Sequence, residues 1–165
     1  GAKGVMYFCY YTPLSDEFPK GGAVITRDDR RTRHYGQAQR INAGIKRLGP
    51  VLMQLTCDGV TRIARDAHPA PQLTGTPITS LTGGAYILGL FRHADGRRAV
   101  LLMNDDYNYT AWPTVVFDAP LTEVLEVSQE TGRIEPVRDD SPDMPGLQLS
   151  FDAGEGRLFL LPAKK

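Results

Sequence analysis

The chain reads GVMYFCYYTP from Gly4 to Pro13, an almost continuous apolar and aromatic run that stops at a proline. A run of this kind is typical of a parallel β-strand that is covered on both faces. Polar, glycine-containing residues follow over 14–33, and an amphipathic helix is expected from about Arg33. A single strand-loop-helix unit cannot bury both of its own faces. We therefore expect this part of the chain to dock onto other segments, or to have been separated from them.

The expected helix has one apolar face, whose members step by three or four residues: Tyr35, Ala38, Ile41, Ile45 and Leu48. Gly49-Pro50 is expected to interrupt this helix, because proline lacks a backbone N–H and clashes with the preceding turn. Residues 51–55 are expected to add a further turn or two, and Asp58-Gly59 to turn the chain. We assign residues 1–65 to this first part.

The remaining sequence predicts a linker and then an all-β part. Residues 66–80 contain three prolines and little periodicity, which is typical of a linker. From residue 81 the chain consists of short apolar or alternating runs between turn signals such as Asp95-Gly96, at 85–91, 99–104, 114–117, 123–127, 134–137, 147–151 and 157–161. This spacing predicts an antiparallel β-sandwich over 81–165. The predicted fold class is therefore α+β, with one strand-loop-helix unit followed by a sandwich.

The composition bounds the functions that are open. The chain has 165 residues, of which 41% are hydrophobic and 23% charged, as in ordinary soluble domains. Its formal net charge is zero, which argues against a nucleic-acid partner. No apolar run is long enough to span a membrane, and the first residues lack a signal-peptide pattern. We expect neither a nucleic-acid nor a membrane partner.

We expect no cofactor and no metal site. Cys9 and Cys57 lie far apart, and neither has a second cysteine or a histidine at metal-ligand spacing. The three histidines, His34, His68 and His93, are scattered. A disulfide between the two cysteines remains open, although two buried free thiols are the favoured reading. Serine-hydrolase and phosphate-loop motifs are also missing from the sequence.

Several stretches resemble one known family. Residues 1–13, GAKGVMYFCYYTP, look like the eighth strand of a (β/α)8-barrel glycoside hydrolase, of the clan that includes β-galactosidases and cellulases. Residues 41–52 resemble the last helix of such a barrel. Residues 89–104 resemble the opening hairpin of the β-sandwich that follows it, and residues 149–161 resemble its closing strands.

The resemblance implies a C-terminal part of a glycoside hydrolase that braces the catalytic barrel and is not catalytic alone. In that clan the two catalytic carboxylates lie at the ends of the fourth and seventh strands, before the stretch that this chain matches. Retaining hydrolysis needs both carboxylates about 5 Å apart. The resemblance also implies a secreted or periplasmic parent protein. The chain departs from the pattern at Tyr11, where many relatives carry a tryptophan that stacks on sugar.

Two groups of residues are candidates for carbohydrate binding. Tyr10 and Tyr11 fall at the C-terminal end of the expected strand, the end where barrel active sites lie, so they could line a sugar site. The alternative is that one tyrosine points into the barrel and the other lies under its helix layer. In the neighbouring loop, Asp16 and Glu17 are adjacent, and we expect them to be solvated.

The second group lies in the stretch NDDYNYTAW, residues 104–112, which concentrates Tyr107, Tyr109 and Trp112 beside amide and carboxylate groups. Flat aromatic faces with hydrogen-bonding neighbours suit a sugar-binding surface. Oxygen ligands for Ca²⁺ are a further possibility, although the EF-hand pattern is not present. The competing expectation is that Trp112 packs over a barrel interface or plugs the end of the sandwich.

Three functions therefore remain open from the sequence. The first is a brace for a glycoside hydrolase barrel, whose partner is the remainder of that barrel. The second is a stand-alone carbohydrate-binding sandwich, which would bind an oligosaccharide or polysaccharide. The third is a protein-interaction domain that uses its exposed strand and helix, with a second copy of the chain as one such partner.

Overall fold

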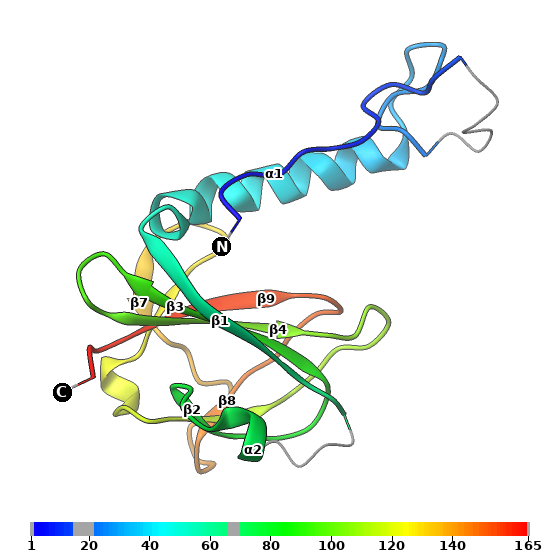
Figure 1. Ribbon diagram of the computed structural model, residues 1–165. Helices are drawn as coiled ribbons and strands as arrows, with labels where there is room; N and C mark the ends of the chain where they lie inside the picture. The colour runs from blue at the N-terminus through cyan, green and yellow to red at the C-terminus, as the bar shows by residue number, and fades with distance from the viewer. Residues whose placement is uncertain (1, 15–21, 66–69, 165) are drawn as a thin grey trace. The chain divides into compact units, whose positions relative to one another are not determined.

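The structure is a computed structural model that describes residues 2–14, 22–65 and 70–164. The chain forms two compact units, which divide between Met53 and Gln54. The first unit contains the helix α1 (Arg33–Leu52) and the extended segment before it. The second unit contains nine strands and two short helices among the described residues (Figure 1).

The second unit is built from two antiparallel sheets in a sandwich-like arrangement, so the predicted α+β class and its sandwich part are confirmed. The larger sheet has six strands in the order β1-β3-β4-β9-β6-β7. Their bounds are β1 Leu55–Ile63, β3 Tyr86–His93, β4 Arg98–Asn104, β6 Leu125–Val127, β7 Ile134–Pro136 and β9 Gly156–Leu161. The smaller sheet is β2-β5-β8, with β2 Ile78–Leu81, β5 Thr114–Phe117 and β8 Leu147–Gln148. The short helices are α2 (Ala70–Leu73) and the 3-10 helix η1 (Leu121–Glu123).

The core lies between the two sheets. Phe159 of β9 is fully buried, and its ring centroid lies 5.5 Å from that of Phe117 on β5. Leu88 and Val100 are also fully buried in this layer. Successive side chains along a strand point to opposite faces, and in β3, β4 and β9 this alternation places these three side chains on the same face of the larger sheet. The short apolar runs of the sequence form strands because they can bury this face.

The predicted hairpin at Asp95-Gly96 is confirmed. β3 and β4 pair in register from Tyr86↔Asn104 to Arg92↔Arg98. Gly96 has φ 91°, a left-handed conformation that glycine adopts without steric cost. The sharp turn fixes the register of the two central strands, and through them the position of Asn104 at the end of β4.

Residues 54–65 differ from the prediction. They were assigned to the first part of the chain, with a turn at Asp58-Gly59. Instead, Leu55–Ile63 forms the strand β1 and pairs with β3, and Asp58-Gly59 is accommodated as a bulge. Alternate side chains of this stretch are more buried, a two-residue period that is typical of a strand.

The predicted linker also differs. Of residues 66–80, residues 66–69 lie outside the described ranges, whereas α2 and most of β2 occupy residues 70–80. β2 pairs with β5, so this stretch belongs to the smaller sheet rather than joining two bodies. Pro71 lies in the first turn of α2 and Pro77 directly precedes β2, two places where a missing N–H costs no helix or ladder hydrogen bond.

The helix α1 begins at the predicted residue but does not break at Gly49-Pro50. Thr32 caps its N-terminus, since its side-chain oxygen accepts a hydrogen bond from the backbone N–H of His34 at 3.2 Å. The helix continues through Pro50 to Leu52. Because Pro50 is close to the C-terminus of the helix, it removes only one backbone hydrogen bond of the last turns. The end of the helix therefore stays intact.

The predicted strand over residues 4–13 is absent from the described segment. Residues 2–14 are extended along α1 (Figure 1), where the hydroxyl of Tyr7 donates to Asn42 Oδ1 at 3.0 Å. The described backbone pairing of this segment centres on a parallel bridge between Tyr11 and Ile25, with Thr12 N–H donating to Ile25 O at 3.0 Å. A strand needs a neighbouring ladder of donors and acceptors, and the described first unit supplies only this short one.

Candidate functional site

The loop after β4 is held in place by a buried amide. Asn104 is 1% exposed, and its Nδ2 donates to Tyr109 O at 2.9 Å and to Asp152 O at 3.0 Å. The two acceptors belong to different turns, so the side chain of Asn104 joins the aromatic loop to the turn before β9. This fixed geometry is the local reason why the loop keeps one shape.

A carboxylate inside the loop reinforces that shape. Asp106 Oδ1 accepts hydrogen bonds from the backbone N–H groups of Asn108 at 2.9 Å and of Tyr109 at 3.1 Å. Its other oxygen pairs with Arg65. The N–H groups of Asn108 and Tyr109, together with the Arg65 charge, lower the pKa of Asp106 despite the opposing effect of burial. Both oxygens of Asp106 are therefore engaged, one inside the loop and the other by Arg65.

The loop presents its aromatic side chains to solvent. Tyr107 is 79% exposed, Tyr109 is 68% exposed and Trp112 is 73% exposed. Trp112 therefore does not plug the end of the sandwich, as one of the two expectations held. The structure brings these three predicted residues together in one loop.

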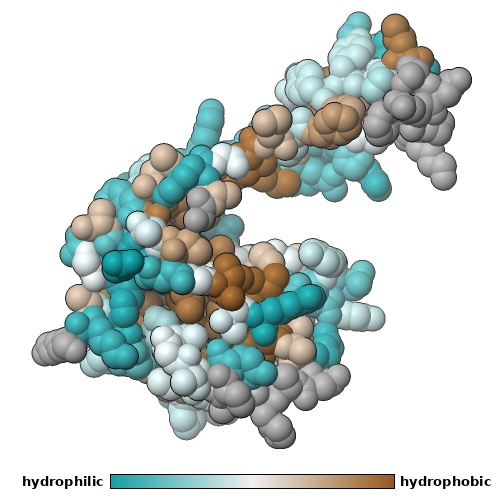
Figure 2. All heavy atoms as spheres, viewed as in Figure 1, coloured by the Kyte–Doolittle hydropathy of each residue, from teal (hydrophilic) through white to brown (hydrophobic). Residues whose placement is uncertain are grey.

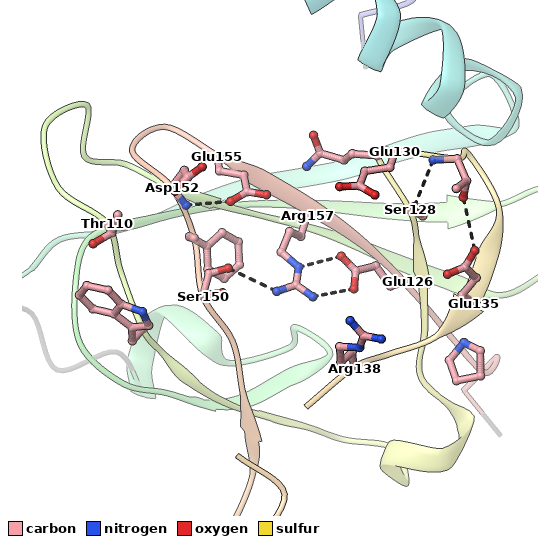
Figure 3. A pocket seen from close by; sticks show the side chains of 15 residues that line it. Thr110, Glu126, Ser128, Glu130, Glu135, Arg138, Ser150, Asp152, Glu155 and Arg157 are labelled. Carbon is pink, nitrogen blue, oxygen red and sulfur yellow. Dashed lines mark hydrogen bonds and ion pairs between the residues drawn. The ribbon is translucent and has the colours of Figure 1, made fainter. Parts of the chain in front are cut away.

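A groove lies beside this loop (Figure 3). It encloses a volume of about 850 Å³ and is lined by fifteen residues, among them Thr110, Trp112, Glu126, Ser128, Glu135, Arg138, Ser150, Asp152 and Arg157. Its lining comes from β6, β7 and β9 of the larger sheet and from two segments joined at the Ala111↔Phe151 bridge. Tyr107 and Tyr109 are not among the lining residues.

The floor of the groove is an ion pair on the inner face of the larger sheet. Arg157 Nε donates to Glu126 Oε1 at 2.7 Å, and its Nη2 donates to Oε2 at 2.6 Å. The two side chains are 14% and 18% exposed. Burial disfavours the charged guanidinium, but the hydrogen bonds and charge of Glu126 outweigh that effect, so the pKa of Arg157 lies above its ordinary value.

The strand register explains why polar groups lie next to the core. Across the sheet, Phe159 of β9 is opposite Glu126 of β6, which is opposite Glu135 of β7. Residues paired in this way point to the same face, so one row passes from core phenylalanine to two carboxylates. The smaller sheet has three strands against six in the larger one. It covers Phe159, whereas Glu135 on the edge strand is exposed.

The groove carries an excess of negative charge. Its lining includes five carboxylates, Glu126, Glu130, Glu135, Asp152 and Glu155, and two guanidinium groups, Arg138 and Arg157. Side-chain hydroxyls of serine and threonine lie between them (Figure 3). The arrangement can both donate and accept hydrogen bonds, with an exposed indole at its margin.

Tyr10 and Tyr11 lie in the other compact unit, so the structure does not join them to the aromatic loop in one site. Tyr10 is 62% exposed and lines a hollow of about 420 Å³ with Tyr7, Tyr35 and Asn42. The hydroxyl of Tyr11 donates to Asp29, and this bond, with burial and the neighbouring carboxylates, raises the pKa of Tyr11. Asp16 and Glu17 lie outside the described residues.

Metal-ligating side chains and thiols are scattered over the described ranges. No group of three or more metal-ligating side chains gathers there. Cys9 and Cys57 are free thiols and belong to different units. No helix in the described part of the chain is long and apolar enough to cross a membrane.

Sequence reasoning missed the floor of the groove. A signal was available, because Arg157 is the one charged residue in the otherwise apolar run of β9, and it shares a face with Phe159. Pairing of β6 with β9, which brings Glu126 to Arg157, is a long-range contact that local patterns do not encode. Comparison with known proteins adds no assignment: no family model, no curated protein and no solved structure matches this chain.

Proposed function

We propose that this chain serves as the C-terminal part of a glycoside hydrolase. Residues 2–53 would supply the last strand and helix of a (β/α)8 barrel, and the sandwich-like unit would brace that barrel. The parent protein would act on oligosaccharides or polysaccharides outside the cytoplasm. This assignment extends the resemblance seen in residues 1–13, 41–52, 89–104 and 149–161.

The observation that carries the proposal is the exposed apolar segment at residues 5–14. Met6 is 95% exposed, Phe8 is 88% exposed and Leu14 is 88% exposed. Figure 2 shows apolar residues open on the surface of this unit. Contiguous exposed apolar side chains mark a surface that another element covers. Neighbouring barrel strands would cover this one and complete its backbone hydrogen bonds.

The proposal assigns no hydrolysis to residues 1–165 by themselves. Retaining hydrolysis needs a nucleophile and an acid/base carboxylate about 5 Å apart, and other barrel units would provide both. Tyr10 and Tyr11 would then lie near the sugar site, since they fall at the C-terminal end of that strand, where barrel active sites lie. Their hydroxyls and ring faces would contact substrate rather than react with it.

The test is purification of the protein from its source with an antibody against the sandwich-like unit. Intact mass and light scattering give the assembly, and nitrophenyl β-glycosides report hydrolysis. We expect the chain within a larger polypeptide or complex that is active, whereas residues 1–165 alone are inactive. Recovery of a lone 165-residue monomer, or of a self-associated form without other barrel units, would contradict the proposal.

A second candidate function is carbohydrate binding by the sandwich-like unit. The specific observation is the solvent-exposed set of Tyr107, Tyr109 and Trp112 on a loop that Asn104 and Asp106 hold rigid. Preorganised aromatic faces lose little conformational entropy on binding a sugar ring. Binding of a polysaccharide by the isolated chain, lost in Trp112→Ala, tests this function independently of the barrel.

A further inference from the structure

Building on the second candidate function, we infer that the groove is a binding site for a neutral oligosaccharide, with Trp112 as its stacking face and the Arg157–Glu126 pair as its floor. The site differs from a flat aromatic platform, because Tyr107 and Tyr109 do not line it. It lies wholly within the sandwich-like unit.

The groove has the size and shape of a ligand site. A groove of about 850 Å³ lies within the range of about 300–1,000 Å³ that is usual for ligand sites. Its walls come from different segments of the chain, which Asn104 and the Ala111↔Phe151 bridge tie together. Phe151 O accepts the Ala111 N–H at 3.0 Å, so the wall that carries Trp112 is anchored on both sides of the bridge. The groove is therefore preformed rather than assembled by the ligand.

The chemistry of the lining favours sugar hydroxyls. Each hydroxyl both donates and accepts a hydrogen bond, and the groove offers carboxylate acceptors, guanidinium donors and serine and threonine hydroxyls (Figure 3). Trp112 is 73% exposed beside these groups, so its ring can lie against the apolar C–H face of a pyranose. An aromatic face with polar groups around it is the combination that a sugar ring needs.

The charges select against acidic sugars. Five lining carboxylates outnumber two guanidinium groups, and Arg157 is already neutralised by its two bonds to Glu126. A uronic acid entering the groove would meet net repulsion, which is costly in a partly dehydrated site. Glu135 faces the groove from the edge strand, where its neighbours include Thr131, whose hydroxyl donates to it at 3.3 Å.

The test is affinity electrophoresis of the whole 165-residue chain in gels that contain galactomannan, xyloglucan, mixed-linkage β-glucan or the polyanion polygalacturonate. Trp112→Ala and Glu135→Gln probe the groove, with thermal melting to show that each variant is folded. Tyr107→Ala tests the aromatic loop outside the groove. Phe8→Ala is the matched control for an exposed aromatic side chain, and Glu123→Gln is the matched carboxylate control, because none of these three residues lines the groove.

We expect at least one neutral glycan, and not polygalacturonate, to retard the chain. Trp112→Ala should weaken that binding about tenfold or more, as loss of a central aromatic contact usually does, and Glu135→Gln about threefold, whereas both controls stay unchanged. Binding that is lost in Tyr107→Ala but kept in Trp112→Ala would overturn the groove and leave sugar binding standing. Preference for polygalacturonate, or no retardation by any glycan, would also overturn the proposal that the groove binds a neutral oligosaccharide. The barrel assignment is tested separately, by the assembly purified from its source.

Discussion

Asn104 should be the most sensitive polar residue of the candidate site. Its amide is 1% exposed and donates to the carbonyls of Tyr109 and Asp152. Replacement by alanine removes both bonds and leaves two carbonyl oxygens without their donor. At about 0.5–1.5 kcal/mol for each net hydrogen bond, Asn104→Ala should lower the free energy of unfolding by about 1–3 kcal/mol.

Asn104→Asp sharpens the prediction. The carboxylate keeps the shape of the side chain. However, it replaces the buried NH2 group, which donates to two carbonyl oxygens, with an oxygen that can only accept. At pH 7 it should therefore destabilise the chain more than alanine does. Because a protonated carboxyl can donate again, Asn104→Asp should recover part of its stability as the pH falls toward the ordinary aspartate pKa of about 3.9, in contrast to Asn104→Ala.

Urea unfolding, followed by far-ultraviolet circular dichroism, measures these differences. With a slope of about 1–3 kcal/mol per molar urea, a loss of about 2 kcal/mol moves the midpoint by roughly 1 M. Asn108→Ala is the control, since Asn108 is exposed and contributes its backbone N–H to the loop. If both Asn104 variants unfold at the same urea concentration as this control, the amide does not hold the loop and the reasoning fails.

Three further predictions concern the sandwich-like unit. Burial raises the pKa of Tyr86 to about 12, against a partial lowering by Arg65, so the protonated phenol stabilises the fold fully below pH 10. This stabilisation, on the order of 2 kcal/mol, should be lost between pH 10 and 12, and Tyr86→Phe should not show this loss. Urea titrations of both proteins over this pH range measure the difference. Coinciding pH profiles would contradict the prediction. Glu126→Ala leaves the Arg157 guanidinium partly buried without its carboxylate, so it should lower the free energy of unfolding by about 1–3 kcal/mol. In an Arg157→Met background the same substitution should cost less, because no guanidinium is left unpaired. If the two effects are additive in this double-mutant cycle, the pair does not stabilise the fold. Gly96→Ala forces a side chain into a left-handed turn and should cost about 1 kcal/mol in the same unfolding assay, whereas an unchanged midpoint would mean that the turn relaxes.

The elements that the sequence predicts well are those with strong local signals. The β3–β4 hairpin follows from two apolar runs around Asp95-Gly96, and the start of α1 follows from a regular apolar face. The exposed aromatic loop at Tyr107–Trp112 was also recognisable from composition. In each case, neighbouring residues carry the information.

The elements that the sequence misses depend on distant partners. β1 contains a bulge at Asp58-Gly59, so a turn signal was misleading until its pairing with β3 was known. The groove requires the register of β6 against β9, which places Glu126 beside Arg157. Residues 4–13 differ in the other direction: their sequence predicts a strand, but none forms. The described first unit offers no neighbouring strand with which they could form a ladder of hydrogen bonds.

Amide hydrogen exchange across residues 4–13 can decide whether barrel strands flank this segment. It should be measured on the isolated chain and on the assembly recovered from its source. We predict rapid exchange in the isolated chain, where residues 4–13 belong to no strand, and strong protection in the assembly, where barrel strands flank them. Protection that is already complete in the isolated chain, or rapid exchange in the assembly as well, would contradict the barrel assignment.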